Sequence, residues 1–147
     1  MYRQRRDNPA EANVLLNENI YLRREKRYFM KPLFLQYPNC DTSRRAAKWL
    51  KAHHVDVDSR NIVTENPRVE ELIEWIGRSG LPVRKFFNVS GVKYKELNLK
   101  ERVKTAPDEE LVALLASDGK LVKRPLLITG ERVLVGFVEK EWIDLLE

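Results

Sequence analysis

The fold is decided by residues 33–45, which read LFLQYPNCDTSRR. The apolar start of this stretch predicts a buried strand, and the turn-forming Pro38-Asn39 pair then leads into a helical pattern. Cys40, the only cysteine of the chain, therefore stands directly before a helix start. The unpaired N–H groups and the positive dipole end of a first helical turn lower the pKa of a thiol. This position predicts a reactive cysteine, with a small buried hydrophobe as the alternative.

Two further elements complete a strand-helix-strand unit. A helix is expected over 43–54, with an apolar side formed by Ala46, Ala47, Trp49 and Leu50. Residues 55–63 read as a second strand, because valine and isoleucine are interspersed with polar residues. Such a connection is right-handed, so the two strands are expected to be parallel. His53 and His54 fall at the far end of the helix, which favours cations at a helix C-terminus over a catalytic base.

The middle of the chain predicts helices. Asn66-Pro67 opens a helix that ends at Gly80, with its expected buried face at Val69, Leu72, Ile73 and Ile76. Residues 81–105 break into short pieces typical of irregular helical packing. A further helix is expected from Pro107 to Asp118, because apolar residues recur there at helical spacing.

The C-terminal part predicts a hairpin followed by a short helix. The apolar runs 126–128 and 133–135 flank a turn, and a helix with Trp142 and Ile143 closes the chain. Arg124-Pro125 stands at the entry to this hairpin. Proline there is ordinarily an edge feature, whereas a cis bond turns the backbone sharply toward a neighbouring site.

The composition bounds the domain organisation. A chain of 147 residues suffices for one domain with a core. Residues 1–30 hold seven Lys and Arg against four Asp and Glu, which is +3 of the formal net charge of +5. We expect 1–30 to be a loosely ordered basic extension or a single helix, and 31–147 to be the folded domain. The single cysteine and the lack of an apolar run of about 18 residues favour the cytoplasm, with no membrane partner.

Taken in their order along the chain, these elements and motifs resemble the ArsC, Spx and MgsR family of thioredoxin-like proteins. The string CDTSR at 40–44 resembles the nucleophile loop of arsenate reductases, and residues 81–97 resemble their inserted helical region. KRPLL at 123–127 resembles the segment before the hairpin. The resemblance covers 31–147 and implies an α/β thioredoxin-like fold with a mixed four-stranded sheet and a helical insertion. We also expect a cis Arg124-Pro125 bond that faces Cys40.

The resemblance implies a site around the thiol. Cys40 would be the nucleophile that attacks an arsenate oxyanion or a disulfide, and Arg84 and Arg124 would hold the anion, with Ser43 and Arg44 beside them. An oxyanion at a helix N-terminus meets free N–H groups, and guanidinium groups bind its oxygens bidentately. The hydroxyl or N–H of Ser43 either stabilises the thiolate of Cys40 or caps the helix.

Two departures from the family pattern bear on function. Ser43 stands where many relatives carry the second cysteine of a Cys-x-x-Cys pair, so no internal disulfide switch can form. Residues 134–137, LVGF, lack a third anion-holding arginine. That loss weakens arsenate binding by about 1.5–3 kcal/mol and argues against true arsenate reductase activity.

Two functions therefore remain open. The first is a cytoplasmic thiol oxidoreductase of arsenate reductase type that acts on a small oxyanion or a disulfide, with glutathione or glutaredoxin resolving Cys40. The second is an Spx-like regulator that binds the RNA polymerase α subunit without catalysis, and a non-catalytic domain is a third reading. The chain ends at Glu147 without the basic tail associated with Spx, which favours the first function. The sequence has no metal-ligand spacing and no phosphate loop, so we expect no metal and no tightly bound cofactor, with glutathione as a cosubstrate.

Overall fold

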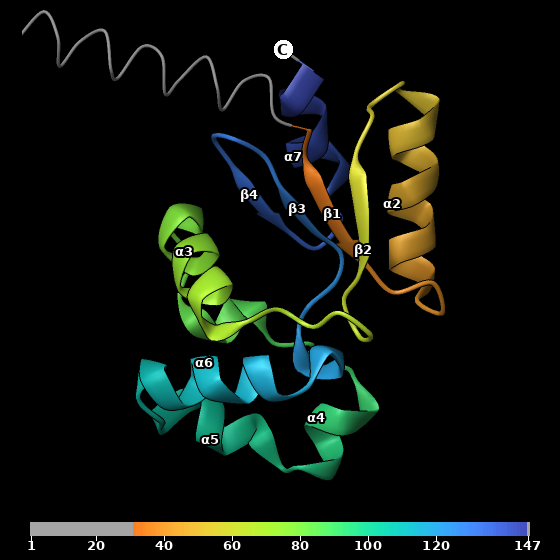
Figure 1. Ribbon diagram of the computed structural model, residues 1–147. Helices are drawn as coiled ribbons and strands as arrows, with labels where there is room; N and C mark the ends of the chain where they lie inside the picture. The colour runs from red at the N-terminus through yellow and green to blue at the C-terminus, as the bar shows by residue number, and fades with distance from the viewer. Residues whose placement is uncertain (1–30, 147) are drawn as a thin grey trace, which may run out of the picture. The chain divides into compact units, whose positions relative to one another are not determined.

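The computed structural model describes residues 31–146, which form an α/β domain on a mixed sheet of four strands (Figure 1). The strands are β1 Leu33–Gln36, β2 Asp58–Asn61, β3 Leu126–Ile128 and β4 Val133–Val135. They lie in the order β2-β1-β3-β4, with β1 parallel to β2 and the other two pairings antiparallel. The predicted mixed sheet with its C-terminal hairpin is confirmed. The predicted basic extension, residues 1–30, lies outside the described residues.

Helices connect the strands and form the predicted insertion. They are α2 Asp41–Ala52, α3 Val69–Ser79, α4 Val92–Glu96, α5 Leu99–Thr105, α6 Asp108–Ser117 and α7 Glu139–Ile143, with 3-10 helices η2 Val83–Phe86, η3 Gly119–Leu121 and η4 Asp144–Leu146. α2 joins β1 to β2, and all elements from α3 to η3 lie between β2 and β3. Within residues 31–146, no helix combines the length and the apolar character that a membrane span requires.

The sheet divides the hydrophobic core in two, because alternate strand residues point to opposite faces. One cluster joins the sheet to α2 and α7: Phe34, Ala46, Trp49, Leu50, Leu127, Leu134 and Trp142. The other joins the sheet to α3 and the insertion, and includes Leu35, Leu72, Phe86, Leu115 and Leu126. Each large side chain buried in this way stabilises the fold by about 1.5–3 kcal/mol. Both faces of the sheet are therefore covered, and α2 is held firmly where its first turn meets the end of β1.

Two predicted element bounds need correction. α2 begins at Asp41 and not at residue 43, so Cys40 is the residue directly before the first helical turn. β2 is limited to Asp58–Asn61, although residues 55–63 were expected to form it. Val55 and Val57 pack against the core cluster of α2 and α7 instead of joining the strand. These two valines are apolar because they are partly buried against this cluster, not because they pair in the strand.

The buried face of α3 also differs from the prediction. Leu72 and Trp75 are buried, whereas Val69 and Ile73 are 40% and 59% exposed. The helix begins at Val69 rather than at Pro67. The large ring of Trp75 covers more apolar surface of the insertion than an isoleucine can, and this sets the rotation of the helix.

The helical insertion meets the sheet closely at Gly119. This buried residue in η3 lies against the backbone that follows β2, and a Cβ atom there would overlap the carbonyl oxygen of Ile62. Only glycine permits such an approach. The contact fixes the path of the segment that runs from η3 into β3, and this segment carries Arg124.

Candidate functional site

Cys40 lies at the junction between β1 and α2. Its backbone N–H donates to the carbonyl oxygen of Tyr37 (2.9 Å), and its own carbonyl accepts from the N–H of Arg44 (3.0 Å). The residue has an extended backbone (φ −100°, ψ 124°) and is half-buried. The turn therefore holds the thiol at the first turn of α2 while leaving part of it accessible.

The surroundings of Cys40 favour its thiolate. Partial burial raises the pKa of the thiol, but the backbone N–H and the hydroxyl of Ser43 lower it, and so does the guanidinium of Arg124. The net pKa lies below the ordinary value of 9.0. Hydrogen bonds to the charged form and a nearby cation outweigh the cost of desolvation. The thiol is thus activated by two residues from distant parts of the sequence.

Ser43 has a structural role as well. Its side chain is buried, with 1% of the residue exposed, and its Oγ accepts a hydrogen bond from the N–H of Tyr37 (3.1 Å). This bond ties the end of β1 to the first turn of α2. Ser43 thus fixes the turn that presents Cys40 and lowers the pKa of its thiol.

Arg124 approaches the thiol from the segment before β3. Its peptide bond to Pro125 is cis. The guanidinium lies over the ring of Tyr37, 4.9 Å from the centroid, and its Nη1 donates to the carbonyl of Lys120 (3.3 Å). Cation–π stacking and this hydrogen bond hold the guanidinium beside Cys40. Its Nε is buried and has no partner among the described residues.

Cys40 and Arg124 line a cavity of about 530 Å³. The other lining residues are Thr42, Asn88, Ser90, Gly91, Val92, Lys123, Val135, Gly136, Phe137 and Val138. Of the residues that the structure describes, two cations and no carboxylate belong to this lining. The volume lies within the range of about 300–1,000 Å³ that is usual for small-molecule sites. The cavity therefore joins an activated thiol to a positive field.

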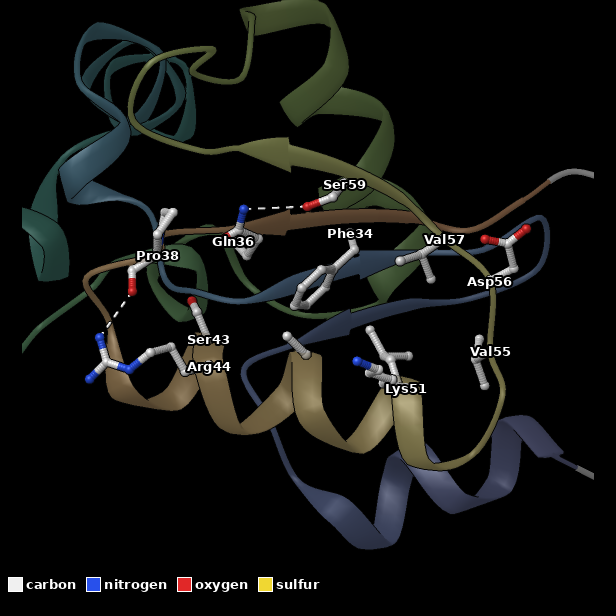
Figure 2. Close-up of a pocket in the computed structure, with 12 residues that line it drawn as sticks. Phe34, Gln36, Pro38, Ser43, Arg44, Lys51, Val55, Asp56, Val57 and Ser59 are labelled. Carbon is white, nitrogen blue, oxygen red and sulfur yellow. Dashed lines mark hydrogen bonds between the residues drawn. The ribbon is translucent and has the colours of Figure 1, made fainter.

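Two of the expected anion-binding residues lie elsewhere. Arg84 is exposed on η2 and is not part of the cavity lining. Arg44 donates from Nη1 to the carbonyl of Pro38 (2.9 Å) and lies 3.6 Å from a carboxylate oxygen of Asp41. Figure 2 shows Arg44 at one end of a separate groove of about 580 Å³ between α2 and the β2 edge of the sheet. The structure therefore brings Ser43 and Arg124 to Cys40, but neither Arg84 nor Arg44 lines its cavity.

The sequence patterns do not indicate Lys123, which is the second cation of the cavity. The only signal is its position next to Arg124 in the KRPLL string. Val135 lines the same cavity, at the place where the family resemblance puts the missing arginine. In residues 31–146, no cluster of three or more His, Cys, Asp or Glu is arranged to hold a metal ion.

The fold and the site define a class. A mixed sheet of this order, a thiol before the first helix after β1 and a cis-proline segment beside it are the features of a thioredoxin-like protein, here with a helical insertion. The chain belongs to the ArsC family, whose profile matches residues 35–145.

Three similar proteins illustrate the range of the family. YusI of Bacillus subtilis is 47% identical over 113 residues, which cover 77% of this chain and 96% of YusI. The regulatory protein MgsR of the same organism is 29% identical over 112 residues, which cover 76% of this chain and 87% of MgsR. The crystal structure of an ArsC family related protein from Bacteroides fragilis has 57% identity and a TM-score of 0.77, and the match covers 79% of this chain and 98% of that one.

Proposed function

We propose that this protein is a thiol oxidoreductase of the arsenate reductase type, in which Cys40 is the nucleophile and glutathione is the cosubstrate. The observation that carries the proposal is the geometry at Cys40. An accessible thiol with a lowered pKa opens on a cavity whose described lining has two cations and no carboxylate. A buried structural cysteine has no such access, and its pKa rises in apolar surroundings.

The proposed reaction is thiol–disulfide exchange. The thiolate of Cys40 attacks the glutathione sulfur of a mixed disulfide R–S–S–G, and the S–S bond breaks to release the thiolate of R, which takes a proton from water. Cys40 then carries glutathione as a mixed disulfide. A second glutathione thiolate attacks that glutathione sulfur, releases glutathione disulfide and returns the thiolate of Cys40. Together, R–S–S–G and one free glutathione give the thiol of R and glutathione disulfide, so the free glutathione is the reductant and R–S is the group that is reduced.

The surrounding residues serve both steps. The N–H and hydroxyl of Ser43 and the guanidinium of Arg124 stabilise the thiolate, which is the attacking group in the first step and the leaving group in the second. Because residue 43 is serine and the chain has one cysteine, an outside thiol must resolve the intermediate. Glutathione or a glutaredoxin fits this requirement.

Oxyanion chemistry is expected to be weak. Within the described part of the chain, Arg124 is the one arginine in the cavity lining, and Val135 presents an apolar side chain there. A tetrahedral anion needs several charge-assisted hydrogen bonds, and each one lost costs about 1.5–3 kcal/mol. A disulfide substrate therefore suits this cavity better than arsenate does.

Intact-mass spectrometry with glutathione disulfide tests the proposal. We expect one glutathione adduct on the wild-type chain, none on Cys40→Ser, and removal of the adduct by reduced glutathione with or without a glutaredoxin. The matched control is Thr42→Ser, which keeps a hydroxyl in the cavity and should retain the adduct. If the wild-type protein takes up no glutathione at neutral pH, the oxidoreductase proposal is wrong.

A regulatory role is the second candidate, and the likeness to the regulator MgsR favours it. In that role the domain binds the α subunit of RNA polymerase and needs no turnover at Cys40. A pull-down with purified α subunit distinguishes the two. Capture that persists in Cys40→Ser, together with no glutathione exchange in the wild type, would favour the regulator.

A further inference from the structure

We infer that Lys123 is the specificity-determining residue of the Cys40 cavity, and that it binds a carboxylate of the thiol or disulfide substrate. This inference rests on the proposed function and names the chemical class of the substrate. It assigns to Lys123 a role separate from that of Arg124, its neighbour in the sequence.

The backbone holds Lys123 firmly at the cavity wall. Its N–H donates to the carbonyl of Phe86 (2.7 Å), which anchors the residue to η2. Its side chain extends along Gly136, where a Cβ atom would stand 3.1 Å from Cε and 3.9 Å from Nζ of the lysine. Gly136 has φ +77° and donates its N–H to the carbonyl of Pro125 (2.8 Å). Glycine here thus serves the backbone conformation and leaves room for the lysine stem.

The ammonium group of Lys123 is available for a ligand. Within residues 31–146, no ion pair or side-chain hydrogen bond involves its Nζ. Among residues 31–146, no carboxylate that could neutralise it lines the cavity. An ammonium beside a cavity without acidic groups attracts anions and raises their local concentration.

Arg124 and Lys123 have different roles in this cavity. The guanidinium of Arg124 is held by the ring of Tyr37 and the carbonyl of Lys120, and it lowers the pKa of Cys40. Its effect is therefore on the charge of the thiol. Lys123 has a fixed backbone, and its ammonium group has no partner within residues 31–146, so it can bind a second anionic group on the same molecule.

The chemistry of the ligand follows from this arrangement. A substrate that reacts at Cys40 carries sulfur at one point, and a group that pairs with Lys123 carries negative charge at another. Glutathione and its disulfides combine a reactive sulfur with carboxylates, whereas simple hydroxyalkyl disulfides lack the charge. The site is therefore expected to select carboxylate-bearing disulfides over neutral ones of similar reactivity.

Competitive alkylation tests the inference without any turnover. Iodoacetate and iodoacetamide react at the same carbon, but only the first carries a carboxylate. The ratio of their rates at Cys40 cancels any change in the thiolate fraction, since both reagents meet the same thiol. We expect Lys123→Gln to lower the iodoacetate-to-iodoacetamide ratio by roughly fivefold at low salt, and Lys123→Arg to restore it.

The matched control is Lys100→Gln, which removes the same charge from an exposed position on α5 outside the cavity lining. Its ratio should equal that of the wild type. An unchanged ratio in Lys123→Gln, or an equal fall in Lys100→Gln, would overturn the inference. Because alkylation needs no glutathione, this failure is distinct from a failure of the proposed function.

A kinetic comparison extends the test to disulfides. With glutathione disulfide and no reduced glutathione, Lys123→Gln should lower the second-order rate constant for adduct formation at Cys40 by roughly fivefold, because a binding contact is lost. With bis(2-hydroxyethyl) disulfide, also without reduced glutathione, the variant and the wild type should form the adduct at the same rate. An equal loss for both substrates would mean that Lys123 acts on the thiol and not on substrate charge.

Discussion

Two arginine–acid pairs in this domain share a chemistry but differ in their surroundings. Arg60 on β2 donates two hydrogen bonds to the carboxylate of Glu71 on α3, at 2.7 and 3.0 Å. It also donates to the carbonyls of Glu65 and Asn66 at 2.8 and 3.1 Å, so every guanidinium nitrogen has a partner. The two side chains are only 18% and 17% exposed. This pair is saturated and joins the edge strand to α3.

The pair formed by Arg124 and Cys40 is incomplete by comparison. Arg124 donates one hydrogen bond to a carbonyl, its Nε is without a partner among the described residues, and it lines an open cavity. The hydrogen bonds of Arg60 are the main cause that lowers the pKa of Glu71, to about 2, and Arg124 contributes to the lowered pKa of Cys40. A lowered pKa therefore does not by itself mark a functional group. Access and unused hydrogen-bonding capacity distinguish the candidate site from the structural pair.

The largest expected effect comes from replacing Cys40, the acid of the Arg124–Cys40 pair. Cys40→Ser should abolish glutathione exchange, because a hydroxyl is not a competent nucleophile toward a disulfide at neutral pH. The melting temperature should stay within a few degrees of the wild type, since the thiol is half-buried and its backbone contacts remain. Exchange assays and thermal denaturation measure the two outcomes. Residual exchange above the uncatalysed rate would show that another group carries the chemistry.

Removing Glu71, the acid of the Arg60–Glu71 pair, should lower the stability of the fold and leave the activity at Cys40 unchanged. Glu71→Gln leaves Arg60 with an unneutralised charge in a largely buried position, and we expect a loss of about 2 kcal/mol in the free energy of unfolding at pH 7. Urea denaturation measures this loss. Exchange at Cys40 should be unchanged in the folded variant. The exposed neighbour Glu70, changed to Gln, is the matched control and should cost less than about 0.5 kcal/mol.

The same substitution has a defined pH dependence. The pKa of Glu71 is about 2 in the folded protein and 4.5 without its partners. A depressed acid pKa contributes stability above the unfolded value and loses it as pH falls through the folded value. The gap between wild type and Glu71→Gln should therefore be constant above about pH 5 and close between 4.5 and 2. A gap that persists at pH 2 would contradict the role of this ion pair.

Removing the cation of the Arg124–Cys40 pair should lower the reactivity of the thiol. Arg124→Gln removes a cation that lowers the pKa of Cys40, so the thiolate fraction at pH 7 falls. We expect iodoacetamide to react about fivefold more slowly with the variant, and the alkylation midpoint to move to higher pH. Arg84→Gln is the control with the same change of charge outside the cavity, and its rate should match the wild type. Equal slowing in both variants would show that Arg124 affects the Cys40 thiol no more than a distant arginine does.

The smallest effect concerns the apolar wall. Val135→Arg adds a third cation to the cavity lining, and we expect affinity for sulfate or arsenate to rise about threefold. Isothermal titration calorimetry at constant ionic strength measures this change. The gain stays small because the cavity is open to solvent, which screens the new charge. No anion binding in either form would mean that this wall does not belong to an anion site.

Local patterns predicted the elements that depend on few neighbours. The alternation of Phe34 and Leu35 between two core clusters follows from strand geometry, and the hairpin follows from two apolar runs around a turn. The position of Cys40 before a helix also follows from turn residues next to a helical pattern. The patterns alone gave wrong bounds for β2 and a wrong buried face for α3. Whether Val55 joins a strand and whether Ile73 is buried depends on which residues lie next to them in the folded domain.

The sequence by itself determined the order of the elements, the family and the identity of the thiol. The family resemblance also named Arg124, but only the tertiary structure decided that Lys123 lines the cavity while Arg44 and Arg84 do not. Arg44 follows Cys40 by four residues yet donates to the carbonyl of Pro38, whereas Lys123 and Arg124 reach the cavity from a segment more than eighty residues later. The physical reason is that a long cationic side chain goes where packing and free carbonyl groups hold it. Separation along the chain carries no information about that choice.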